Sequence, residues 1–180
     1  EIMPIIPAPS QWGYRNKEQF PVQMVEGRPR LGFYEQYSHR LVPAETCLIQ
    51  HPSICVTAAC VAEHLQRLSI APYDEVKGSG ILRHVIIRTS FSHSDVLVTL
   101  VSAQEDFGRR GDLVQALRRD LPSLVGVTLN VNKQRGNRIL GDRNVILWGK
   151  DFIRQTLHVS GLSLDFHISA PSFFQVNPIQ

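Results

Sequence analysis

The sequence predicts an α+β fold, in which a mostly antiparallel β-sheet packs one face against two helices. Three observations favour this class. Stretches with strand character outnumber stretches with helical spacing by about seven to two. The links between the expected strands have hairpin length rather than the length of a helical crossover. Finally, 43% of the 180 residues are hydrophobic and 19% are charged, which suits one domain with a real core.

The first part of the chain predicts a linker and a hairpin. Residues 1–13 contain three prolines and are expected to be an irregular linker arriving from an upstream segment. Residues 20–25 and 30–34 read as two strands, and residues 26–29 supply the turn between them. Residues 37–42 and 45–50 are expected to form loop and short extended pieces.

The first helix is expected to begin at Pro52 or Ser53 and to end before Pro72. Its apolar residues recur at steps of four and three and form one stripe: Ile54, Ala58, Val61, Leu65 and Leu68. His64 is expected to face solvent. Cys55 and Cys60 are five residues apart and do not share a face, so both are expected to be small buried hydrophobes.

The second helix is expected from Asp112 to Asp120. Asp112 suits the cap at its start, whereas Arg118 and Arg119 suit the negative end of the helix dipole. The remaining expected strands are residues 81–89, 96–101, 125–132, 144–148 and 162–168. The run 96–101 is apolar on both faces, as in a covered central strand.

Composition limits the class of function. The net charge is +3, and fifteen Arg stand against four Lys, a bias that leans toward phosphate and base contacts. Three Cys without a CxxC pair exclude a disulfide framework and a self-contained zinc site of that type. The start lacks a signal peptide and no run of about 18 apolar residues occurs, so we expect a cytoplasmic protein with no membrane partner.

The last stretch, residues 167–178, carries the most chemistry. It places Phe173, Phe174, Gln175 and Asn177 at the end of an alternating strand. One interpretation is a surface that stacks on and hydrogen-bonds a planar base or cofactor. The other is that the two rings are core aromatics at a corner, with the carboxamides capping a turn.

Several ordered motifs resemble the RNA uracil-C5 methyltransferases, the family that makes 5-methyluridine. They are Tyr14–Lys17, Gly32–Tyr34 with Ser38–Arg40, Cys47–Gln50, Gly80–Val85 with Arg88, Asn130–Asn132 with Asn137 and Gly141, and Ser172–Asn177. The versions in this chain look most like bacterial enzymes acting on 23S ribosomal RNA. The resemblance implies a linker (1–13), a central α+β domain (14–169) and the start of a Rossmann-like catalytic domain (170–180), so the chain is expected to be an inactive piece of a longer protein.

The resemblance also implies residue roles. Gln175 falls where the family contacts S-adenosylmethionine, and Phe173 falls where an aromatic lies near the flipped base. Cys47 falls where many members place the fourth ligand of a [4Fe–4S] cluster, which one Cys cannot hold alone. The nucleophilic Cys and the cofactor loop belong to parts beyond this chain. Without them, the segment from Phe173 to Asn177 is expected to be disordered or to dock on a neighbouring molecule.

The expected partner is large-subunit ribosomal RNA, together with the protein's own missing domains. The candidate RNA contacts are Arg15, Lys17, Arg83, His84, Arg88, Arg135 and Arg138. Arg83 and Arg88 have opposite parity in a regular strand and are therefore not expected on one surface. The loop 133–143 is the densest basic segment and a candidate backbone contact. A non-catalytic RNA-binding module and a scaffolding domain remain alternatives.

Overall fold

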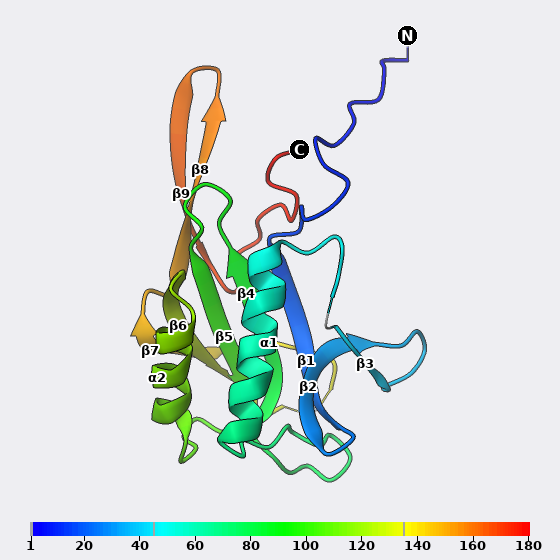
Figure 1. Cartoon of the computed structure of the whole chain (residues 1–180), viewed down its shortest axis with the longest axis vertical. Helices are drawn as coiled ribbons and strands as arrows, with labels where there is room; N and C mark the ends of the chain where they lie inside the picture. The colour runs from blue at the N-terminus through cyan, green and yellow to red at the C-terminus, as the bar shows by residue number, and fades with distance from the viewer. Residues whose placement is uncertain (1, 45, 135) are drawn as a thin grey trace.

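The computed structural model describes residues 2–44, 46–134 and 136–180. Within this part of the chain the elements follow the order β1 (Lys17–Val25), β2 (Arg28–Tyr34), β3 (Leu41–Pro43), α1 (Pro52–Arg67), β4 (Leu82–Thr89), β5 (Val96–Ser102), α2 (Arg110–Asp120), β6 (Leu124–Val131), β7 (Arg143–Gly149), β8 (Phe152–Val159) and β9 (Leu162–Ser169). Both helices lie on one face of the main sheet (Figure 1). The expected α+β class is confirmed.

The main sheet has seven strands in the order β3-β2-β1-β4-β5-β6-β7 among the described residues. Its neighbouring strands are antiparallel except for β5 and β6, which pair in parallel. A parallel pair needs a crossover connection, and α2 supplies it between these two strands. The expectation of hairpin-length links alone was therefore wrong at this point.

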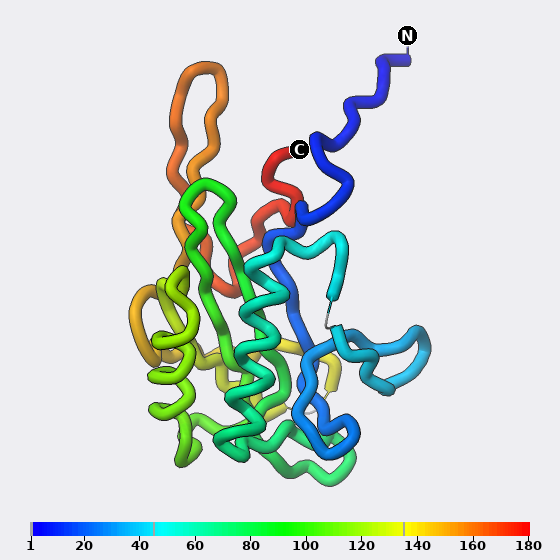
Figure 2. The backbone as a smooth tube through the Cα atoms, in the orientation of Figure 1, coloured from blue at the N-terminus to red at the C-terminus, as the bar shows by residue number. Residues whose placement is uncertain are grey.

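A second sheet consists of β8 and β9, paired antiparallel from Phe152 with Ser169 to Val159 with Leu162. Strand β8 was not expected, because its residues 152–159 do not alternate cleanly between apolar and polar side chains. The two-residue turn at Ser160 and Gly161 has φ values of 50° and 79°, which suits a tight hairpin. The hairpin tip projects beyond the main sheet (Figure 2).

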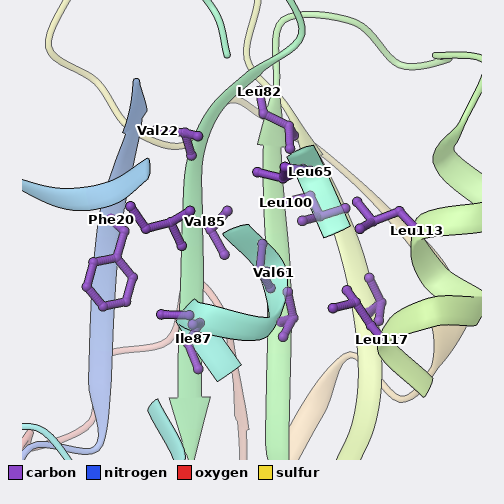
Figure 3. Packing of buried hydrophobic residues seen from close by; sticks show 14 of the residues in the cluster. Phe20, Val22, Val61, Leu65, Leu82, Val85, Ile87, Leu100, Leu113 and Leu117 are labelled. Carbon is purple, nitrogen blue, oxygen red and sulfur yellow. The ribbon is translucent and has the colours of Figure 1, made fainter. Parts of the chain in front are cut away.

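The core lies between the helices and the sheet, and Figure 3 shows side chains of both layers meeting there. The expected stripe of α1 is buried at Ile54, Ala58, Val61 and Leu65. It packs on Phe20, Val85, Ile87 and Leu100 of the central strands and on Leu113 and Leu117 of α2. Each such side chain is worth about 1.5–3 kcal/mol of burial, so the helix face and the central strands form one cooperative unit.

Three details of the helices differ from expectation. His64 is 3% exposed rather than solvent-facing, and its Nε2 lies 2.8 Å from Oδ2 of Asp120, which gives the buried ring a polar partner. The cap of α2 is Arg109 without a side-chain cap bond, not Asp112. Asp112 instead pairs with Nε of Arg109 at 2.6 Å. Cys55 and Cys60 are half-buried rather than fully buried.

The opposite face of the sheet is covered in part by the base of the β8–β9 hairpin. Leu97 of β5 packs there with Ile153 and Ile168, and Phe174 lies against the same cluster. This explains why every residue of β5 is buried, as its apolar run predicts. In the described part of the chain, no helix has both the length and the hydropathy needed to cross a membrane.

Candidate nucleic-acid interface

The segment after β9 returns to the start of β1 and docks there (Figure 2). The backbone N–H of Asn16 donates to the Val176 carbonyl at 3.0 Å, and Nδ2 of Asn16 donates to the Gln175 carbonyl at 3.0 Å. Arg88 of β4 donates to the carbonyls of Ala170 and Ser172. The expectation of a disordered segment, or of docking on a neighbouring molecule, was therefore wrong, because this chain's own strands satisfy its carbonyls.

Between the docked segment and β1 lies a hollow of about 380 Å³. We name it the basic groove, and it is lined by Arg15, Lys17, Glu18, Gln19, Phe33, Arg88, Ser172, Phe173, Phe174 and Val176. Four candidate residues that are far apart in the sequence meet here: Arg15, Lys17, Arg88 and Phe173. The strand pairing brings them together, since Lys17 and Arg88 are direct cross-strand partners.

The groove brings positive charges together at a place where water has limited access. Burial, together with the neighbouring cations Arg88 and Arg15, lowers the pKa of Lys17 to about 8. Burial also raises the pKa of Glu18, against the effect of the Arg15 guanidinium with which it forms an ion pair. One carboxylate therefore stands against three cations in this groove, which leaves it suited to an anion.

Arg88 is 2% exposed, and burial lowers its pKa to about 10. Its Nε has no hydrogen-bond partner in the structure. An unpaired buried donor is costly, and this atom is closed to solvent in the structure. The main role of Arg88 here is to hold the carbonyls of the docked segment.

The two aromatic interpretations of the last stretch each fit one residue. The ring of Phe174 lies 6.0 Å from that of Phe166, beside the second core cluster. The ring of Phe173 is 91% exposed. Gln175 is also exposed, and its backbone carbonyl is held by Asn16. Phe174 is thus a packing residue, whereas Phe173 presents a free π-face at the rim of the groove.

Arg83 does not join the basic groove. It is 5% exposed, its Nε lies 2.8 Å from Oε1 of Glu75, and it donates to the carbonyls of Asn132 and Gln134. The register of β4 shifts between Leu82 and His84, so the simple parity argument for Arg83 and Arg88 does not hold. Arg83 ties loops together rather than presenting its cation.

Two asparagines hold the loop 133–143: Asn130, which lies in β6, and Asn132, which follows the end of β6. Asn130 exchanges hydrogen bonds with Gly141 at 2.7 and 3.0 Å. Asn132 donates to the carbonyls of Arg138 and Ile139 at 2.6 and 2.9 Å. The guanidinium of Arg138 pairs with Asp142 at 2.5 Å and is otherwise exposed. Arg135, the other candidate of this loop, lies outside the described residues.

The remaining candidates lie elsewhere. His84 is largely buried, and burial followed by the Arg83 charge lowers its pKa to about 4, so it is neutral near pH 7. Cys47 is a half-exposed free thiol in a loop. Among the described residues, no group of three or more His, Cys, Asp or Glu ligand atoms includes Cys47.

Sequence reasoning did not single out Asn16 or Glu18. Asn16 is 3% exposed and fixes the docked segment, although it stands between two of the candidate cations. Glu18 is 5% exposed and neutralises Arg15. The available signals in the sequence were the position of Asn16 between Arg15 and Lys17, and that of Glu18 three residues after Arg15.

Known proteins share this chain's sequence and fold. No family model matches it. An uncharacterized RNA methyltransferase of Caldanaerobacter subterraneus subsp. tengcongensis is 40% identical over 167 residues, which are 93% of this chain and 36% of that protein. Another, of Halalkalibacterium halodurans, is 36% identical over 179 residues, 99% of this chain and 38% of that protein. The chain thus spans little more than a third of the length of these curated relatives.

The fold also matches a solved structure. The crystal structure of the Pyrococcus abyssi tRNA (uracil-54, C5)-methyltransferase, in complex with S-adenosyl-L-homocysteine, superimposes with a TM-score of 0.76. The match covers 97% of this chain and 39% of that chain at 22% identity. At this identity the likeness shows the fold alone.

The sheet has two helices on one face and the basic groove at the ends of the inner strands β1 and β4, and this α+β fold is shared with that solved structure. The sequence similarities confirm the resemblance more closely: this chain is a relative of part of the bacterial RNA methyltransferases.

Proposed function

We propose that this chain is the RNA-binding central domain of a cytoplasmic, S-adenosylmethionine-dependent RNA (uracil-C5) methyltransferase that acts on 23S ribosomal RNA. The RNA methyltransferase relatives support the general class. The tRNA (uracil-54, C5)-methyltransferase that shares the fold supports the choice of base and atom. The choice of ribosomal RNA rests on the motifs quoted above.

The observation that carries the proposal is the basic groove with Phe173 at its rim. Three cations converge on a hollow of about 380 Å³, and an aromatic ring that is 91% exposed stands beside them. Cations bind the phosphate backbone without regard to sequence. A free ring stacks on an unpaired base, which is worth about 1–3 kcal/mol per base. The groove therefore combines both parts of a single-strand RNA contact.

This pairing also fits the chemistry. An enzyme that methylates a ring carbon must take the base out of the helix and hold it, and Phe173 would receive that base. Gln175, exposed two residues later, would contact the methyl donor S-adenosylmethionine. Residues 170–180 would then begin the catalytic domain, while the nucleophilic thiol lies outside this chain. The chain by itself is expected to transfer no methyl group.

An iron–sulfur cluster is a weaker part of the proposal. Such a cluster needs about four thiolates, whereas this chain has three cysteines, and Cys47 is a free thiol. The residues present do not make a [4Fe–4S] site by themselves. Cys47 would contribute one ligand only if the remaining ligands came from another segment of the longer protein.

The test is fluorescence anisotropy of a uridine-bearing ribosomal RNA hairpin titrated with the 180-residue chain, across salt from about 50 to about 200 mM. We expect the chain to bind this RNA with an affinity that falls steeply as the salt concentration rises. Lys17→Gln should reduce the slope of log K against log salt by about one. Phe173→Ala should weaken binding by about 10-fold or more with an unchanged slope.

Matched controls separate the groove from general basicity. Lys77→Gln removes a lysine whose side chain is 76% exposed and which lies outside the groove. Tyr37→Ala removes an aromatic that is 99% exposed in another loop. Both should bind as the parent does. If all four variants bind the RNA equally, or if the folded parent shows no salt-dependent RNA binding, this domain does not bind RNA through the basic groove.

A further inference from the structure

Three side chains of the metal-binding type come together where the C-terminal half of α1 meets the C-terminal end of α2. Cys60 and His64 lie four residues apart on α1 and therefore share a face. Asp120, the last residue of α2, reaches the same place. One ligand atom from each of the three lies within 4.8 Å of the others. They form the one such group of three among the residues that the structure describes.

The donor set suits a particular kind of ion. Thiolate sulfur, imidazole nitrogen and carboxylate oxygen are the ligands that Zn²⁺ takes, in tetrahedral geometry and at bond lengths that place neighbouring donors about 3.5 Å apart. The three ligand atoms lie within 4.8 Å of one another, and Nε2 of His64 and Oδ2 of Asp120, which are 2.8 Å apart in a direct hydrogen bond, would have to separate by about 0.7 Å. Small rotamer changes would thus admit an ion among the three.

The surroundings of the three side chains leave one side open for a fourth ligand and hold the Asp120 carboxylate in place. The side chain of His64 is 4% exposed and that of Asp120 is 35% exposed, so one side is dry and the other is open to water. Nε of Arg119 donates to Oδ1 of Asp120 at 2.6 Å, and Nη2 of Arg119 donates to Oδ2, the oxygen that His64 also contacts, at 2.9 Å. These contacts hold the carboxylate in position, as outer partners of metal ligands commonly do.

We propose that Cys60, His64 and Asp120 bind a Zn²⁺ ion, with water as the fourth ligand, and so fasten α1 to the end of α2. As the ion binds, the thiol of Cys60 gives up its proton to solvent and Nε2 of His64 gives up the proton that it donates to Asp120, so that the imidazole binds as the neutral Nδ1–H tautomer and the carboxylate binds through a lone pair. The site lies apart from the basic groove, which is built on β1, β4 and the last segment. It is independent of the proposed function.

The experiment is a Co²⁺ titration of the 180-residue chain after treatment with a chelator. The parent should develop the visible bands of tetrahedral Co²⁺ and a thiolate-to-cobalt charge-transfer band, and Zn²⁺ should abolish both. The double variant Cys47→Ser, Cys55→Ser leaves Cys60 as the sole cysteine and should keep the spectrum. Cys60→Ser should lose the charge-transfer band and bind Zn²⁺ at least tenfold more weakly.

A second measurement covers any variant that is less stable without metal. Thermal unfolding with and without Zn²⁺ should show a rise in Tm for the parent and for the double variant, and a smaller rise for Cys60→Ser and Asp120→Asn. The proposal is overturned if the parent shows no charge-transfer band, or if Cys60→Ser retains both the band and the Tm increase.

Discussion

Lys17 stands beside two arginines, and its pKa sets a pH range for function. Burial, then Arg88 and Arg15, lower that pKa to about 8. RNA affinity should therefore fall as pH rises from about 7 to about 9 and Lys17 loses its charge. Lys17→Arg keeps the charge over this range, so anisotropy titrations of that variant should show little pH dependence. If RNA affinity fell equally in both proteins, the pH dependence would not come from the titration of Lys17.

The same residue affects stability with a definite sign. The pKa of Lys17 falls from 10.5 to about 8 on folding, so between these values the unfolded chain binds more protons than the folded one. The free energy of unfolding should therefore rise as pH increases through this window, because the folded chain no longer has to bury a charged Lys17. Urea unfolding of the parent and of Lys17→Met at a series of pH values measures the difference, which should shrink above about pH 8. A difference that grows with pH would refute the assignment.

Asn16 links the docked segment to the domain through one side-chain bond and one backbone bond. Asn16→Ala removes the side-chain bond, and we expect a loss of about 1 kcal/mol with faster amide exchange over residues 172–177. Hydrogen exchange read by mass spectrometry measures both the place and the size. Asn137→Ala, at an exposed position, is the control and should leave that segment unchanged. Unchanged exchange in Asn16→Ala would mean that other contacts fix the segment.

At the scale of elements, glycines show where backbone approaches are closest. A Cβ on Gly141 would lie 2.0 Å from the Val131 carbonyl, whereas one on Gly111 of α2 would meet nothing within 4 Å. Gly141→Ala should therefore cost about 2 kcal/mol or more. Gly111→Ala should stabilise the helix by about 0.5–1 kcal/mol. Denaturant unfolding of the two variants compares them directly, and the same sign for both would contradict the packing described.

Strands and helices with regular periods could be predicted from the sequence. The stripe from Ile54 to Leu65 and the apolar run of β5 gave the core, because burial follows those periods. Strand β8 was not predicted because the polar run 154–156 interrupts the alternation, although Ile153, Leu157 and Val159 share one face. The parallel pairing of β5 and β6 also depends on long-range contacts. His64 was misjudged because its partner, Asp120, belongs to the other helix.

At the scale of the whole molecule, the candidate site exists only through the fold. Arg15, Lys17, Arg88 and Phe173 were predicted one by one, but pairing of β1 with β4 and docking of the last segment bring them to one groove. Residue type alone could not separate Arg88 from Arg83, which has a different set of partners. Nor could it separate the exposed ring of Phe173 from the packed ring of Phe174.

The most direct test of the central claim is photo-cross-linking of the 180-residue chain to a ribosomal RNA hairpin that carries one 4-thiouridine, with the linked peptide identified by mass spectrometry. The account predicts a cross-link to the segment 171–177, centred on Phe173, which disappears in Phe173→Ala while Tyr37→Ala keeps it. A cross-link confined to the loop 133–143, or one that survives Phe173→Ala unchanged, would contradict the assignment of the RNA site to the basic groove.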